Sequence, residues 1–154
     1  MTETSRTARS RPLLHPHFVG AGAALLITAL VTDLLYWRSL LSAWETFSVW
    51  LITGGLILAL LASVALLFDV LTGRVRQISW LHFGVLGVAV LISIFNVFIH
   101  SRDGYTAVVW QGLLLSAIAA ILLIVIGWHG WSVAKARPFQ SAPSESAPSE
   151  GIRT

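Results

Sequence analysis

Histidine, aspartate and amide side chains interrupt otherwise apolar stretches of this sequence, and they are the residues that could do chemistry. Imidazole can ligate haem iron or another metal, and imidazole and carboxylate groups can both carry protons. A polar group inside a long apolar segment is costly to bury, so each one needs a partner or a function. The candidates are His15, His17, Asp33, Asp69, His82, Asn96, His100, Gln111 and His129.

The spacing of these candidates predicts two polar layers. Three pairs are each 18 residues apart. Eighteen residues make five helical turns, so the two members of a pair lie on one helix face, about 27 Å apart. The pairs are His15 with Asp33, His82 with His100, and Gln111 with His129. One layer then contains His15, His17, Asp69, His82 and His129, and the other contains Asp33, Asn96, His100 and Gln111.

The first functional hypothesis is a b-type haem held by two histidines of one layer. Axial ligands approach the iron from opposite sides, so the two imidazoles must come from facing helices at one depth. His82 meets this requirement, with His15, His17 or His129 as the second ligand. No haem motif accompanies these residues, so the hypothesis of haem b depends on their common depth alone.

The second hypothesis is a proton or ion pathway through Asp33, Asn96, His100 and Asp69. Between the two layers only serine and threonine hydroxyls offer polar groups, and a single four-helix chain seldom encloses a pore, so this hypothesis is weaker. Asp33, His100 and Asp103 could hold a metal ion only if the fold brings all three together. The sequence does not indicate which metal this would be.

The third hypothesis is a non-catalytic membrane subunit or scaffold, in which polar residues only join helices or lie in the lipid interface. The layer spacing is close to the hydrocarbon thickness of about 30 Å. Asp33 could pair with Arg38 or Arg102, and Asp69 with a nearby Arg or His. This hypothesis explains every residue without a cofactor, and we favour it. Enzyme chemistry is not predicted, because no phosphate-binding Gly-rich loop or nucleophile elbow is present.

The elements that must position these residues follow from composition. Of the 154 residues, 56% are hydrophobic and only 11% are charged, whereas soluble domains carry about 25% charged residues. Four uncharged runs of 21 to 31 residues lie between consecutive charges, and about 20 apolar residues cross a bilayer. The sequence therefore predicts an all-α integral membrane protein with four transmembrane helices, at about 16–37, 43–72, 78–100 and 106–133. Short connections make these an up-down-up-down bundle.

The positive charges predict the orientation of the bundle. Seven Lys and Arg residues flank one side, and only Arg38 and Arg102 flank the other; the seven are Arg6, Arg9, Arg11, Arg74, Arg76, Lys135 and Arg137. Cytoplasmic flanks carry the excess of Lys and Arg, so both termini are predicted in the cytoplasm, with the helices in the inner (plasma) membrane. As topology signals, these charges do not indicate nucleic acid.

The ends of the chain are predicted to differ from the 15–134 membrane domain. Residues 1–14 form a basic segment and residues 135–154 contain a duplicated Ser-Ala-Pro-Ser-Glu, so both are predicted to be disordered. The apolar stretch 18–31 lacks a small-residue cleavage pattern, and we read it as a retained helix rather than a signal peptide. Ser42 and Glu45 match a capping box at the start of the second helix.

Short motifs place this chain near a known family. His15-Pro16-His17-Phe18 opens a helix that ends in Asp33-Leu34-Leu35, a second helix ends in Asp69 before Gly73-Arg74, and Asn96 lies late in the third. Over about residues 14–133 the chain resembles bacterial predicted four-span membrane proteins called domain of unknown function 2231.

The resemblance implies no established activity. Some relatives are joined to Rieske iron-sulfur domains, which associates the family with membrane electron transfer and implies a redox or respiratory membrane partner. The sequence contains no Cys with which to build such a cluster. The partners to consider are therefore the lipid bilayer, that redox partner and a second copy of the chain.

Overall fold

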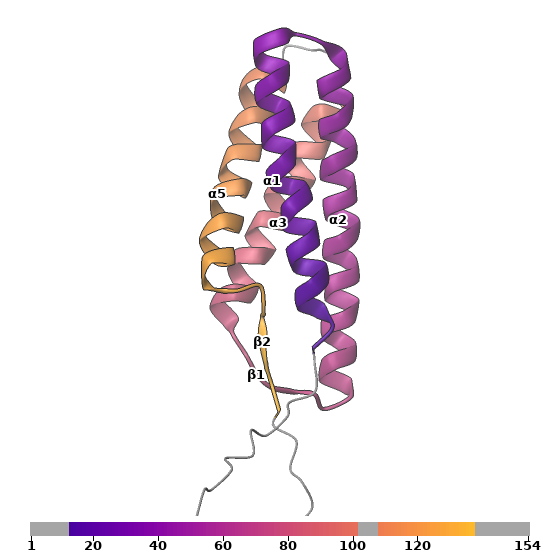
Figure 1. Ribbon diagram of the computed structural model, residues 1–154, viewed down its shortest axis with the longest axis vertical. Coiled ribbons are helices and arrows are strands. Elements are labelled where there is room, and N and C mark those ends of the chain that lie inside the picture. Colours follow the sequence, from indigo (N-terminus) through magenta and orange to yellow (C-terminus); the bar gives the residue numbers. More distant parts are fainter. Residues whose placement is uncertain (1–12, 102–107, 138–154) are drawn as a thin grey trace, which may run out of the picture.

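A computed structural model describes residues 13–101 and 108–137. Four helical segments pack side by side as an antiparallel bundle (Figure 1). They are α1 (His15–Ser39), α2 (Ser42–Leu71), α3 (Trp80–His100), and the π-helical turn η1 (Val108–Gly112) that continues into α5 (Leu113–His129). Two short strands, β1 (Val75–Ile78) and β2 (Ala134–Ala136), complete the described elements. The predicted four-helix bundle is confirmed.

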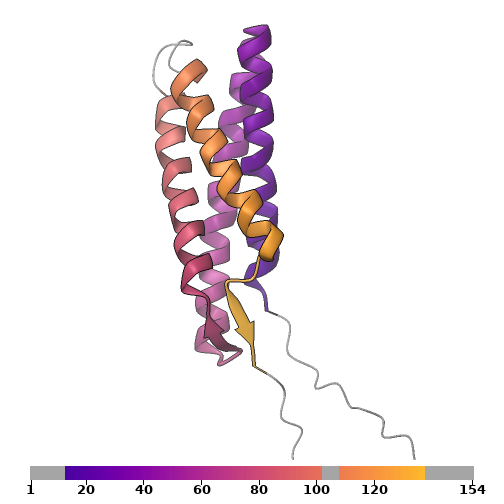
Figure 2. The same cartoon turned by 90° about the vertical axis from the view of Figure 1, so that its left-hand side faces the viewer.

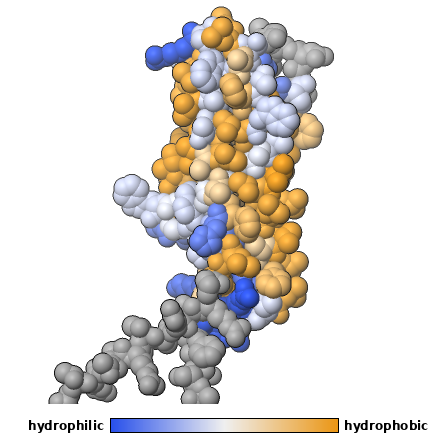
Figure 3. Space-filling view, turned by 45° about the vertical axis from the view of Figure 1, so that its right-hand side comes forward, coloured by the Kyte–Doolittle hydropathy of each residue, from blue (hydrophilic) through white to orange (hydrophobic). Residues whose placement is uncertain are grey.

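All four helical segments are long and apolar enough to cross a membrane, at 20 to 30 residues each. A rise of 1.5 Å per residue gives each a length of about 30 Å or more. Apolar side chains cover most of the visible outer surface along the bundle (Figure 3). Large side chains such as Trp50, Leu71, Trp110 and Trp128 are at least 70% exposed. Hydrocarbon is the solvent that this surface suits.

The helices form a closed ring in which α1 packs against α2 and α5, and α3 packs against the same two helices. Figure 2 shows α5 lying at a slant to the others. Small residues let α1 and α2 approach closely, because a Cβ on Gly55 would lie 2.7 Å from Leu26 Cγ and 3.2 Å from the Gly22 carbonyl oxygen. The shared core consists of Ala23, Leu26, Ala29, Ile52, Ala89 and Leu123.

The two strands form an antiparallel ribbon that the sequence did not predict. Val75 pairs with Ala136 and Ile78 with Ala134, which joins the α2–α3 connection to the segment after α5. Residues 134–136 are therefore an ordered part of the fold, although the segment from 135 was predicted to be disordered. We call this end of the bundle the ribbon end and the opposite end the far end. Residues 1–12 and 138–154, where most of the predicted disorder falls, lie outside the described residues.

The end of the last helix and the cap of the second differ from their predictions, whereas the other described helix bounds lie within two residues of theirs. The last helix stops at His129, four residues early, because Gly130 takes a backbone φ of 102° that ends the helix and turns the chain toward β2. The capping box is wrong: Ser42 is already the first helical residue, Leu41 occupies the cap position, and no side chain caps the helix. Only Leu40 and Leu41 separate α1 from α2, which forces the two helices to be antiparallel neighbours.

Candidate functional site

The far end contains a closed cluster of four polar side chains from three helices. Asp33 comes from α1, Asn96 and His100 from α3, and Ser116 from α5, and none is more than 5% exposed. Asp33 Oδ1 lies 3.1 Å from His100 Nε2, and Asp33 Oδ2 accepts a hydrogen bond from the Ser116 hydroxyl. Asn96 Nδ2 donates to the Ser116 oxygen at 2.7 Å. The cluster thus joins α1, α3 and α5.

The contacts of His100 show where its protons lie. His100 Nδ1 is 2.9 Å from the carbonyl oxygen of Asn96, and because a carbonyl only accepts, Nδ1 carries a hydrogen. The contact between His100 Nε2 and Asp33 Oδ1 also needs one proton. It lies either on the ring, giving an imidazolium beside a carboxylate, or on the acid, giving two neutral groups. The pair therefore holds one proton that can belong to either residue.

Gly112 provides the space for this histidine. A Cβ on Gly112 would lie only 2.8 Å from His100 Cε1, closer than carbon atoms approach. Gly112 is the last residue of η1, the π-helical turn that precedes α5. A π-turn shifts the register of a helix and often accompanies a functional site. The backbone of η1 and the missing side chain together let His100 reach Asp33.

A second cluster lies at the ribbon end, where Asp69 of α2 receives the start of α1. Asp69 Oδ2 accepts from the backbone amide of Leu14 at 3.0 Å and from that of His15 at 3.4 Å, and it lies 3.0 Å from His15 Nδ1. Arg74 approaches the other carboxylate oxygen at 3.7 Å. Asp69 therefore caps α1 from another helix, and the negative charge suits the positive end of the helix dipole.

The pairing of Asp69 with a nearby His and Arg is as predicted, but that of Asp33 differs. Its partner is His100 rather than Arg38, which is exposed. Arg102 and Asp103, the other residues considered near Asp33, lie outside the described residues. A neutral or shared-proton partner is reasonable here, since a buried ion pair is costly to desolvate.

Four buried polar atoms have no hydrogen-bond partner among residues 13–101 and 108–137. They are His15 Nε2, Asp69 Oδ1 and Arg74 Nε at the ribbon end, and Asn96 Oδ1 at the far end. Leaving such an atom unpaired costs about 1–3 kcal/mol. Asp69 and Arg74 face each other as an ion pair, so His15 Nε2 and Asn96 Oδ1 are the points at which each cluster could still bind a ligand.

Three of the proposed haem ligands line one open pocket at the ribbon end. His17, His82 and His129 border a space of about 860 Å³, together with residues that include Ser79 and Lys135. His82 Nδ1 lies 2.9 Å from the Ser79 hydroxyl, and His129 Nδ1 donates to the carbonyl oxygen of Val125 at 2.9 Å. Their Nε2 atoms remain available for a ligand. The described part of the chain holds no group of three His, Asp or Glu residues close enough to bind a metal ion.

The remaining sequence candidates are separated from this pocket. His15 is 1% exposed and faces Asp69, and Gln111 is exposed on η1. Sequence reasoning missed Ser116 as part of a site, although it is an isolated hydroxyl in the apolar run that begins α5. Gly112 was also missed. The need for a glycine at this position becomes clear only once the structure places the His100 ring against its backbone.

We expect Ser116→Ala to destabilise the protein by about 1–3 kcal/mol, because the Asn96 amide and one Asp33 oxygen lose a buried partner. The measurement is reversible unfolding in mixed detergent micelles. Ser93→Ala is the matched control: Ser93 is equally buried, but its hydroxyl bonds only to the carbonyl of Ala89 in its own helix. Equal losses for the two variants would mean that the Ser116 bridge does not join the helices.

Comparisons with known proteins agree with the architecture. No curated protein and no solved structure matches this chain. A family model described as "Predicted membrane protein (DUF2231)" matches residues 11–138, which is most of the chain and includes both clusters and the ribbon. The protein therefore belongs to the family of predicted membrane proteins known as domain of unknown function 2231.

Proposed function

We propose that the protein is a non-catalytic membrane subunit whose intramembrane polar residues hold its helices together. One observation carries this proposal: each deeply buried carboxylate faces a buried histidine of a different helix. Asp69 joins α2 to His15 of α1, and Asp33 joins α1 to His100 of α3. A hydrogen bond formed between helices in a lipid environment stabilises their association.

The space between the two clusters supports this role over a proton or ion pathway. The core that separates them consists of alanine, leucine and isoleucine side chains. The described hydroxyls near mid-bundle, such as those of Thr28 and Ser63, donate to carbonyls of their own helix turns. A chain of proton carriers between the clusters is therefore not formed by these residues.

A double-mutant cycle tests the subunit proposal. We expect Asp33→Asn and His100→Gln each to destabilise the protein, with a coupling energy of about 0.5–3 kcal/mol, because each substitution removes the same contact. Unfolding is followed in detergent, and proton flux is measured in liposomes containing the unaltered chain. Additive effects of the two substitutions, or a flux above empty liposomes that Asp33→Asn abolishes, would contradict the proposal.

We also propose that the ribbon end faces the cytoplasm of the cell, with the bundle in the plasma membrane. The described cations support this orientation, because Arg74, Arg76, Lys135 and Arg137 lie at the ribbon end whereas Arg38 lies near the far end. Cytoplasmic flanks carry such an excess of positive charge.

Cysteine labelling of intact cells tests this orientation. The chain has no native Cys, so each engineered residue gives a unique signal. A membrane-impermeant maleimide should label Ser39→Cys in intact cells and Arg137→Cys only after lysis; both side chains are exposed. The reverse pattern would mean that the bundle is inverted.

A second candidate function is b-haem binding in the ribbon-end pocket. The observation that favours it is the shared pocket of His17, His82 and His129, which come from three helices. The Nδ1 contacts of His82 and His129 orient both rings, as outer hydrogen bonds do for metal-ligating histidines. His82 and His129 are therefore the ligand pair that we propose, and His15 is left out because it does not line this pocket.

Haemin titration of the purified protein tests this candidate. We expect a Soret band that shifts on reduction and that is lost in both His82→Ala and His129→Ala, because each removes an axial ligand. His17→Ala is the control, and it should retain the spectrum. A protein that develops no Soret band, or one whose band survives both ligand substitutions, would exclude this haem site.

A further inference from the structure

A crevice at the ribbon-end half of the bundle is separate from the open histidine pocket. It has a volume of about 170 Å³ and is bordered by residues of α1, α2 and α3, with Val133 at one side. Its lining is apolar except for His15 and Ser63, and the Ser63 hydroxyl is already bonded within α2. Ser63, Phe83 and Gly87 are exposed at its mouth, so the crevice opens toward the surface that suits lipid.

His15 gives this crevice a defined chemistry. Its Nδ1 atom contacts Asp69 Oδ2, which also accepts two backbone amides. An oxygen that accepts all three hydrogen bonds is a carboxylate oxygen, so the histidine hydrogen lies on Nδ1. In the neutral ring Nε2 is then a hydrogen-bond acceptor, and it is buried without a partner in the described part of the chain. A ligand that completes this site must offer an O–H or N–H donor.

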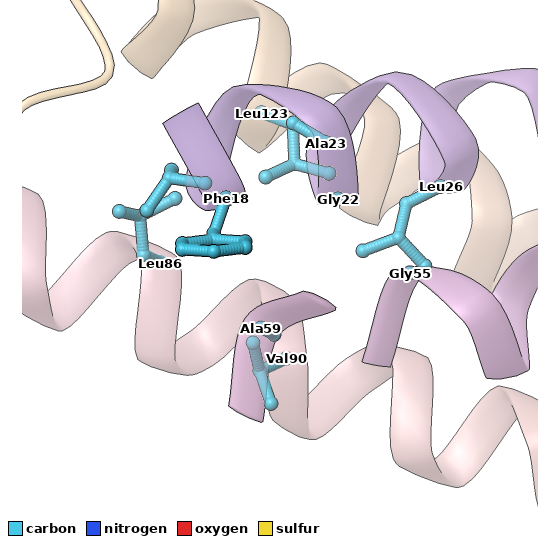
Figure 4. A pocket seen from close by; sticks show the side chains of 10 residues that line it. Phe18, Gly22, Ala23, Leu26, Gly55, Ala59, Leu86, Val90 and Leu123 are labelled. Carbon is cyan, nitrogen blue, oxygen red and sulfur yellow. The ribbon is translucent and has the colours of Figure 1, made fainter. Parts of the chain in front are cut away.

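The shape of the space narrows the class of ligand. A second cavity of about 50 Å³, whose lining includes Gly22 and Gly55 (Figure 4), adjoins the crevice, because Val19, Leu86 and Val90 line both spaces. The wide part lies beside His15, and the narrow part is lined only by apolar residues. A ligand with a flat head and a thin apolar tail fits these two connected shapes, and an aromatic residue, Phe83, is among the residues that line the wide part. Because no Asp, Glu, Lys or Arg lines the crevice, the head must be uncharged.

We propose that this crevice binds a lipid-soluble hydroquinone, whose ring hydroxyl donates a hydrogen bond to His15 Nε2. Asp69 orients the imidazole for this contact. Binding is independent of the haem candidate, because none of the three histidines of the open pocket lines the crevice.

Equilibrium binding to the full chain in phosphatidylcholine nanodiscs tests the proposal. The probes are decylubiquinol, decylubiquinone, decylbenzene and dodecanol. We expect the quinol to bind at least tenfold more tightly than decylbenzene, which lacks the hydroxyl, and more tightly than its quinone, which offers no donor. Dodecanol should also bind more weakly than the quinol, because it has the donor without the ring. Equal binding of decylbenzene or dodecanol, or tighter binding of the quinone, would overturn the assignment.

Two glycine substitutions locate the site without disturbing the contact between His15 and Asp69. A side chain at Gly87 would enter the crevice, whereas Gly84 lies one turn away and does not line it. Neither position brings a Cβ within 4 Å of another group, so both variants should fold. Gly87→Leu should weaken quinol binding at least tenfold, and Gly84→Leu should leave it unchanged. Equal affinities for the two variants would place the ligand elsewhere and overturn the proposal.

Discussion

A carboxylate surrounded by hydrocarbon and packed helices must find a partner on another helix, and this constraint organises the bundle. A charge buried among apolar side chains without a partner costs far more than a charge on the surface of a soluble protein. Each of the two buried carboxylates, Asp33 and Asp69, has a histidine as its partner on another helix. A histidine can share a proton with a carboxylate instead of forming a fixed ion pair. α1 supplies one member of each pair, His15 and Asp33. This helix is therefore held at both of its ends.

Close backbone approach makes those pairs reachable. Gly22 and Gly55 bring α1 against α2, and the bare backbone of Gly112 lets His100 extend toward α1. The polar contacts then fix the rotation of each helix about its own axis. Apolar packing specifies this rotation poorly, because the neighbouring helices are as apolar as the lipid. Small residues set the distances between helices, and the clusters set their register.

Depth in the membrane could be predicted from sequence, whereas direction around each helix could not. The rise per residue along a helix is constant, so the lengths of the apolar runs located the four helices. For the same reason, the 18-residue spacing within two of the polar pairs placed His100 at the level of Asp33. His15 and His17 were assigned to one layer. Residues two positions apart in sequence, however, point in directions about 200° apart around a helix. His15 consequently meets Asp69 while His17 lines the open pocket. The ribbon was not foreseen either, because its strands are three or four residues long and their pairing depends on how the helices return.

The ribbon also has a consequence for biosynthesis. β2 is made after the four candidate spans that the structure describes, and its partner β1 lies between the second and third of them. Pairing can thus occur only once α5 has been inserted and has returned the chain to its starting side. The wall that Ala134 and Lys135 contribute to the open pocket forms at that moment. A truncated or misinserted product would lack this wall, so the late strand makes the completed pocket a marker of correct assembly.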